Sequence, residues 1–114
     1  MGTKIELEAG FDCDFSAMDS EQRHRHSRLV RELFSGIHGL HETPTGFLFE
    51  FARSDEQLLK IAEWTTLESR CCPFFRFRID LRPRSELLQV TVTGPSGSKE
   101  LIRGYLKEMS TREA

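Results

Sequence analysis

The sequence has no long apolar run, no strong excess of one charge and few cysteines, and each shortage excludes a class of protein. Its 114 residues are 30% charged and 38% hydrophobic, with a formal net charge of −2. No stretch can span a bilayer, and the first residues, MGTKIELEAG, contain no apolar segment of signal-peptide length. We therefore expect a cytoplasmic protein without a membrane partner, and the near-neutral charge argues against nucleic acid as a partner.

The three cysteines, Cys13, Cys71 and Cys72, are too few for a disulfide framework and lack the C-x-x-C spacing. That spacing is typical of structural zinc sites and of thioredoxin-like redox motifs, so neither is predicted. An odd number of cysteines without an export signal favours free thiols in a reducing compartment. The Cα atoms of adjacent residues lie about 3.8 Å apart, whereas a disulfide needs roughly 4.4–6.8 Å. We therefore expect Cys71 and Cys72 to be two free thiols.

Hydrophobic periodicity predicts four strands and three helices. Alternating apolar residues predict strands over residues 5–15, 47–51, 74–82 and 87–93, the first of them interrupted at Gly10. Helical spacing and capping residues predict helices over residues 19–35, from Ser54 to Cys71 or Cys72, and after Ser96 or Ser98. Residues 39–46, GLHETPTG, are predicted to form a turn.

These elements predict a single α+β domain over residues 1–114, with residues 1–10 as an N-terminal extension strand. We expect a two-layer sandwich, with a mainly antiparallel sheet of about four strands and three helices in the order β-α-β-α-β-β-α. The alternation implies that helices cover one face of the sheet, with Leu81 among the inward residues. The open face would carry Leu48, Phe74 and Leu87, which favours a homodimer.

The candidate site is the segment ESRCCPFFRF at the end of the second helix. Glu68 lies four residues after Trp64, three before Cys71 and four before Cys72, so all four share one helix face. A carboxylate on an apolar stripe is costly to bury alone, so Glu68 should be paired, protonated or functional. Arg76 is the candidate partner.

Two interpretations of this cluster are open, and the second is the leading one. In the first, Glu68 forms a salt bridge with Arg76 and the cysteines fill core volume, as free cysteines often do. This gives a non-enzymatic dimerisation or interaction module. In the second, the thiols bind an ion whose positive charge stabilises the thiolates at a helix end that would otherwise disfavour them.

The second interpretation predicts a cytoplasmic thiol protein that binds a soft metal or metalloid. Its ligands are Cys71 and Cys72, with Cys13 as the third sulfur, and Glu68 and Arg76 act as proton donors or acceptors or support the ligands. Thiolates select soft or borderline ions such as Cu(I) and Zn(II), and mercury and trivalent arsenic follow by the same softness. We assign no catalytic residue. A thiol-redox enzyme is a third and weaker hypothesis, because activated cysteines usually lie at helix N-termini.

The motifs resemble those of a family of small, largely uncharacterised bacterial proteins. Family members share an early cysteine, a strand like GFLFEF, a helix ending E-x-x-C-C-P-F-x-x-F, and a hairpin ending T-G-P-x-G. Here these correspond to Cys13, residues 46–51, residues 68–77 and residues 93–97, which together cover nearly the whole domain. The resemblance implies a thiol site and an association with mercury or other heavy-metal resistance.

Overall fold

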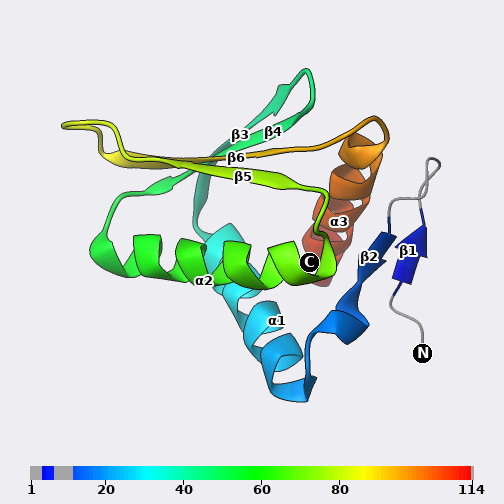
Figure 1. Cartoon of the computed structure of the whole chain (residues 1–114). Coiled ribbons are helices and arrows are strands. Elements are labelled where there is room, and N and C mark those ends of the chain that lie inside the picture. Colours follow the sequence, from blue (N-terminus) through cyan, green and yellow to red (C-terminus); the bar gives the residue numbers. More distant parts are fainter. Residues whose placement is uncertain (1–3, 7–11, 114) are drawn as a thin grey trace.

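A four-stranded antiparallel sheet with three helices on one face forms the body of the protein in the computed structural model (Figure 1). The structure describes residues 4–6 and 12–113, and the side chains of residues 16–107. The sheet has the order β3-β4-β6-β5, formed by β3 (Ile37–Thr43), β4 (Gly46–Ala52), β6 (Leu87–Thr93) and β5 (Arg76–Asp80). The helices are α1 (Ser20–Ser35), α2 (Asp55–Cys71) and α3 (Ser98–Glu113). The α+β class predicted from the sequence is confirmed.

The helix boundaries follow from local chemistry. Asp19 caps α1 through a capping box with Gln22, in which each side chain bonds the other residue's backbone amide, at 2.8 and 3.0 Å. Ser54 caps α2 by accepting a hydrogen bond from the Gln57 amide. At its other end α2 stops at Cys71, because Pro73 offers no amide hydrogen and biases its preceding residue away from the helical region. These boundaries match the predicted ones closely.

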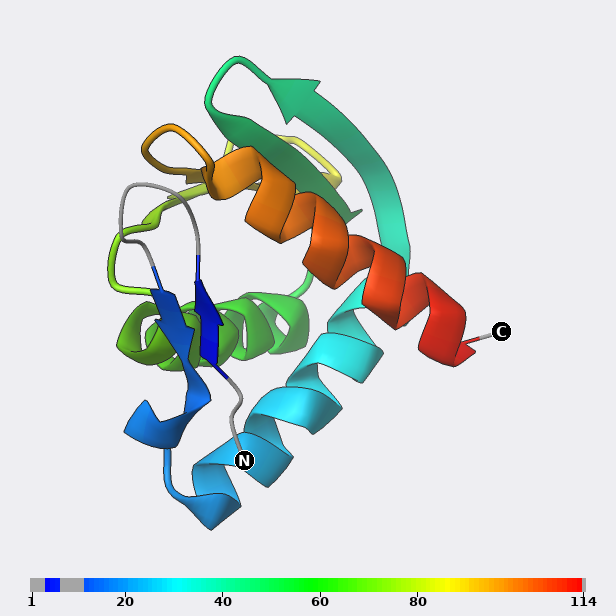
Figure 2. The same cartoon turned by 90° about the vertical axis from the view of Figure 1, so that its right-hand side faces the viewer.

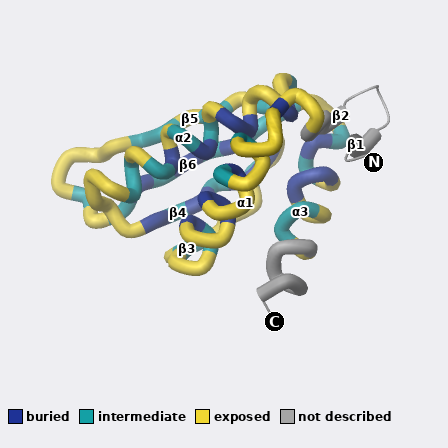
Figure 3. Tube along the Cα trace, turned by 90° about the horizontal axis from the view of Figure 1, so that it is seen from below, coloured by how far each residue is buried: buried dark blue, intermediate teal, exposed yellow. Residues whose placement is uncertain are grey.

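The core lies between the sheet and the helices. On β4, Phe47, Phe49 and Phe51 face inward, opposite Val92, Val90 and Leu88 of β6. The Trp64 ring of α2 makes edge-to-face contacts with three phenylalanine rings, those of Phe34, Phe49 and Phe77. Figure 3 shows the same pattern along the chain, with buried positions where the sheet and helices meet and exposed positions on the outer turns. This packing fixes α2 over the middle of the sheet.

Three details of the sheet differ from the sequence prediction. Residues 39–46 were predicted to form a turn, but residues 37–43 form edge strand β3. This strand is mostly polar and contains a register shift between Ile37 and Gly39, so its sequence shows no alternation of apolar and polar residues. Leu81 follows the end of β5 and is exposed instead of facing inward. Phe74 packs against the core and so does not belong to the open face. The homodimer stays a prediction.

The N-terminal segment forms a small hairpin apart from the main sheet. Instead of one long strand, β1 (Lys4–Glu6) and β2 (Asp12–Asp14) pair antiparallel, with Ile5 opposite Cys13. Residues 7–11, including the expected break at Gly10, lie outside the described residues. A short 3-10 turn, η1 (Phe15–Ala17), leads from β2 towards α1, and both β2 and η1 pack against α2 (Figure 2). Within the described part of the chain, no helix is long and apolar enough to cross a membrane.

Candidate metal centre

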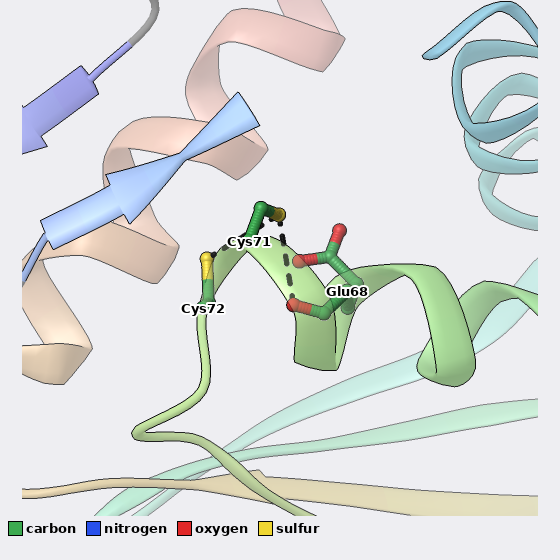
Figure 4. Close-up of side chains that lie close together, drawn as sticks. All are labelled: Glu68, Cys71 and Cys72. Atoms are coloured by element: carbon green, nitrogen blue, oxygen red, sulfur yellow. Dashed lines mark hydrogen bonds between the residues drawn. The ribbon is translucent and has the colours of Figure 1, made fainter. Parts of the chain in front are cut away.

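The last turn of α2 brings a carboxylate and two sulfurs together in the interior (Figure 4). Glu68 is 5% exposed, Cys71 0% and Cys72 2%. One Glu68 carboxylate oxygen and the two Sγ atoms all lie within 4.8 Å of one another, and the sulfurs are 3.8 Å apart. The prediction that Glu68, Cys71 and Cys72 lie close together is therefore confirmed. These are the ligand types that bind metal ions, so the cluster can hold one.

The helix end fixes the backbone of this cluster. The Cys72 amide donates to the Glu68 carbonyl at 2.8 Å and closes the final turn. The Cys71 thiol also points to that carbonyl, at 3.5 Å. Cys72 is the first residue outside the helix, so its side chain leaves in a different direction from that of a helical residue. This geometry lets two adjacent cysteines place their sulfurs near each other.

Glu68 is held by one side chain from each of the three helices. The Oε2 atom lies 2.6 Å from His26 Nε2 of α1, and it accepts hydrogen bonds from Trp64 Nε1 at 3.2 Å and from the Tyr105 hydroxyl at 3.3 Å. His26 is 4% exposed, so the pair with Glu68 is buried on both sides. A 2.6 Å separation is a short hydrogen bond between the two side chains. The expectation that a buried Glu68 has a partner is confirmed.

The other Glu68 oxygen, Oε1, receives no hydrogen bond from the residues whose side chains are described. Because the three contacts all use Oε2, the carboxylate is oriented without occupying Oε1. Arg76, the partner suggested by the sequence, is exposed on β5, and no ion pair joins it to Glu68 in the described part of the chain. The partner of Glu68 is therefore His26, and the prediction of Arg76 is wrong.

A small aromatic cavity adjoins Glu68. It has a volume of about 30 Å³ and is bordered by α2, α3 and the sheet. Its wall includes Trp64, Phe75, Phe77 and Tyr105, and Glu68 is the acidic group in it. Such a volume holds about one water molecule, far below the several hundred Å³ of a typical organic-ligand pocket. The size of the cavity therefore favours an ion or a water molecule near Glu68 over an organic substrate.

The two adjacent cysteines are in different oxidation states. Cys71 is a thiol outside any disulfide, whereas Cys72 is disulfide-bonded. The expectation of two free thiols therefore holds for Cys71 and is wrong for Cys72. The short Cα–Cα distance disfavours only a bond between the two neighbours, and no such bond joins them here, since their sulfurs are 3.8 Å apart.

The side chain of Cys13, the third expected sulfur, lies outside the part of the chain for which side chains are described. Its backbone belongs to β2, which packs beside α2 and passes close to the two cysteines in Figure 4.

Ion pairs on the surface behave differently from this buried cluster. Arg25 of α1 and Glu63 of α2 form a two-armed salt bridge with both distances at 2.8 Å. The hydrogen bond from Arg25 holds the pKa of Glu63 below its ordinary value. Both side chains are partly exposed, so water and salt screen the pair. The same two helices are thus joined by surface pairs, such as Arg25 with Glu63, and by the buried pair of His26 with Glu68.

No protein-family model, curated protein or solved structure matches the chain. The resemblance suggested by the E-x-x-C-C-P-F motif therefore stays a prediction.

The side chains that hold Glu68 in place were not predicted from the sequence. His26 lies on the apolar stripe of α1, and that position was the available signal, since a histidine among core residues needs a polar partner. Tyr105 is the single tyrosine and Trp64 the single tryptophan of the chain. The polar atoms of buried tyrosine and tryptophan side chains usually form a hydrogen bond, and here both donate to Glu68. No spacing rule links residues 26, 64 and 105, because three separate helices supply them.

Proposed function

We propose that this protein binds a soft or borderline metal or metalloid ion through Cys71 and Cys72, with Cys13 as a third sulfur ligand. The observation that supports this proposal is the buried cluster of Glu68, Cys71 and Cys72, whose ligand atoms lie within 4.8 Å of one another. Sulfur ligands select ions such as Zn(II), Cu(I), Hg(II) and As(III). Metal binding displaces the thiol protons to water, and the Glu68 carboxylate lies beside the two sulfurs.

The reduced protein is the form that binds. A thiolate, and not a disulfide, is the ligand, so the disulfide at Cys72 blocks this residue until a reductant opens it. A dithiol reductant supplies the two electrons: the protein disulfide becomes two thiols and the reductant becomes a disulfide. Metal capture would then depend on the redox state of the cell, which suits an accessory role in heavy-metal resistance.

Titration of the reduced protein with Hg(II) and Zn(II) tests the proposal. Free thiols are counted with a chromogenic disulfide reagent after each addition, in parallel with the bound metal. We expect the three thiols of Cys71, Cys72 and Cys13 to be lost as metal binds, and the double variant C71S/C72S to bind neither metal tightly. Unchanged binding by C71S/C72S would refute the proposal. The E56Q variant is a matched control, since Glu56 is exposed near the other end of the same helix.

The burial of both sulfurs also favours a second function, in which the cysteines are core residues of an interaction module. That function predicts that C71S and C72S lower stability in proportion to the apolar volume lost, while the reduced wild-type protein binds no metal. It also predicts a homodimer in solution. Equilibrium dialysis of metal and sedimentation analysis of the same samples distinguish the two functions.

A further inference from the structure

We infer that the ion bound at this site is divalent and tetrahedrally coordinated, and that Glu68 is one of its ligands through Oε1. The inference rests on the proposed function and narrows it to one class of ion, of which Zn(II) is the commonest. Three features of the structure support it: the distance between the sulfurs, the hydrogen bonds of Glu68, and the charge of the ligand set.

The separation of the two sulfurs matches a tetrahedral angle at a metal. With metal–sulfur bonds of about 2.3 Å, tetrahedral coordination places two sulfurs about 3.8 Å apart. Linear coordination with the same bond length would need about 4.6 Å. The Sγ atoms of Cys71 and Cys72 lie 3.8 Å apart in the form in which Cys72 is disulfide-bonded. Adjacent cysteines at this helix end therefore fit an ion that takes its ligands at tetrahedral angles better than an ion that prefers two opposite sulfurs.

The Glu68 carboxylate is arranged as a ligand with an outer shell of hydrogen bonds. Its Oε2 atom contacts His26, Trp64 and Tyr105, whereas Oε1 has no such contact from the described side chains. Carboxylates that bind metal ions are commonly oriented by hydrogen bonds to the other oxygen. A carboxylate oxygen already lies within 4.8 Å of both sulfurs. A tetrahedral ion would need this distance to shorten to about 3.5 Å, a small side-chain movement.

The charge of the ligand set favours a divalent ion over a monovalent one. The thiolates of Cys71 and Cys72 and the Glu68 carboxylate carry three negative charges, and Cys13 as a ligand adds a fourth, in an interior where each is costly. The ion is the largest positive charge available there, and a divalent ion offsets more of the ligand charge than Cu(I) does. With Cys13 as the fourth ligand the coordination shell would be closed, which is typical of a structural or storage site and not of a catalytic one.

Cobalt(II) is the probe for this inference, because its visible absorption distinguishes tetrahedral from octahedral coordination. We expect the reduced protein to give intense tetrahedral bands with Co(II), which stoichiometric Zn(II) removes. The E68Q variant should shift these bands and weaken Co(II) binding by about tenfold or more. The control variant E56Q, on the exposed face of α2, should match the wild type. Weak octahedral bands, or an E68Q spectrum identical to that of the wild type, would overturn the inference.

A second measurement covers the case in which E68Q does not fold. X-ray absorption of the zinc-loaded wild type should show sulfur ligands at about 2.3 Å together with at least one oxygen at about 2.0 Å. A shell of sulfur alone overturns the role of Glu68. Binding of Hg(II) without Co(II) or Zn(II) also overturns the inference, but leaves the proposed function intact. Metal binding that persists in C71S/C72S refutes both, and so does a reduced wild-type protein that binds no metal.

Discussion

Removal of the His26 side-chain nitrogen should destabilise the protein far more than loss of a surface contact. His26 and Glu68 are both almost fully buried and lie 2.6 Å apart. Removal of one member of such a pair leaves the other without its partner in the interior, at a cost of about 3–5 kcal/mol. That is a large share of the roughly 5–15 kcal/mol that stabilises a domain of this size. For the H26L variant, which keeps much of the volume, we expect a fall in melting temperature of roughly 12–20 °C.

A double-mutant cycle in urea separates the interaction from the change in packing. Variants H26L, E68M and H26L/E68M are unfolded in urea under reducing conditions and followed by circular dichroism. We expect the losses to be non-additive, with a coupling energy of about 2–3 kcal/mol. The matched control is the cycle R25Q, E63Q and R25Q/E63Q, because this exposed pair joins the same two helices. Additive losses at residues 26 and 68, or equal coupling in both cycles, would refute the importance of burial.

Three further predictions concern the surface, the thiol and one glycine. Because Arg25 lowers the pKa of Glu63 below its ordinary value of 4.5, the stabilisation from this pair is complete above that value and is lost as pH falls through the folded-state pKa. Urea unfolding from about pH 6 to about pH 3 should therefore show a weaker acid dependence for E63Q than for wild type. Buried Cys71 should react with iodoacetamide about tenfold more slowly in the folded protein than in urea, and equal rates would contradict its burial. In G46A the new Cβ would overlap the backbone of β6, so we expect the free energy of unfolding to fall by more than about 3 kcal/mol. In the control G36A the new Cβ meets open space, so the same urea assay should show a change within about 0.5 kcal/mol.

The regular elements were predictable because their signals are local. Capping residues such as Asp19 and Ser54 mark the helix starts, and Pro73 marks the end of α2. Strands β4 and β6 are half-buried and central, so their side chains alternate between core and solvent. Edge strand β3 is held by pairing with β4 instead of by burial. It therefore carries no hydrophobic alternation, and its sequence looks like a turn.

The candidate site was predictable only in part. Helical spacing placed Glu68 beside Cys71 and Cys72, and the structure has them together. The partner of Glu68 was not predictable, because His26 is 42 residues away along the chain and meets it only when α1 crosses α2. A salt bridge with an arginine was predicted for Glu68, whereas its partner in the structure is a histidine from a neighbouring helix. The oxidation state of Cys72 likewise depends on the fold around it and not on the spacing of the cysteines.

The hydrogen bond between Trp64 and Glu68 gives the site its own optical signal. Trp64 is the single tryptophan of the chain, so all of the indole emission of the protein comes from a ring that touches the candidate ligand. An ion that binds Glu68 must change the electric field at that indole, and a heavy ion would also quench its fluorescence. Occupancy of the site can thus be followed by fluorescence in the unlabelled protein, with a change that should disappear when Glu68 is replaced by glutamine.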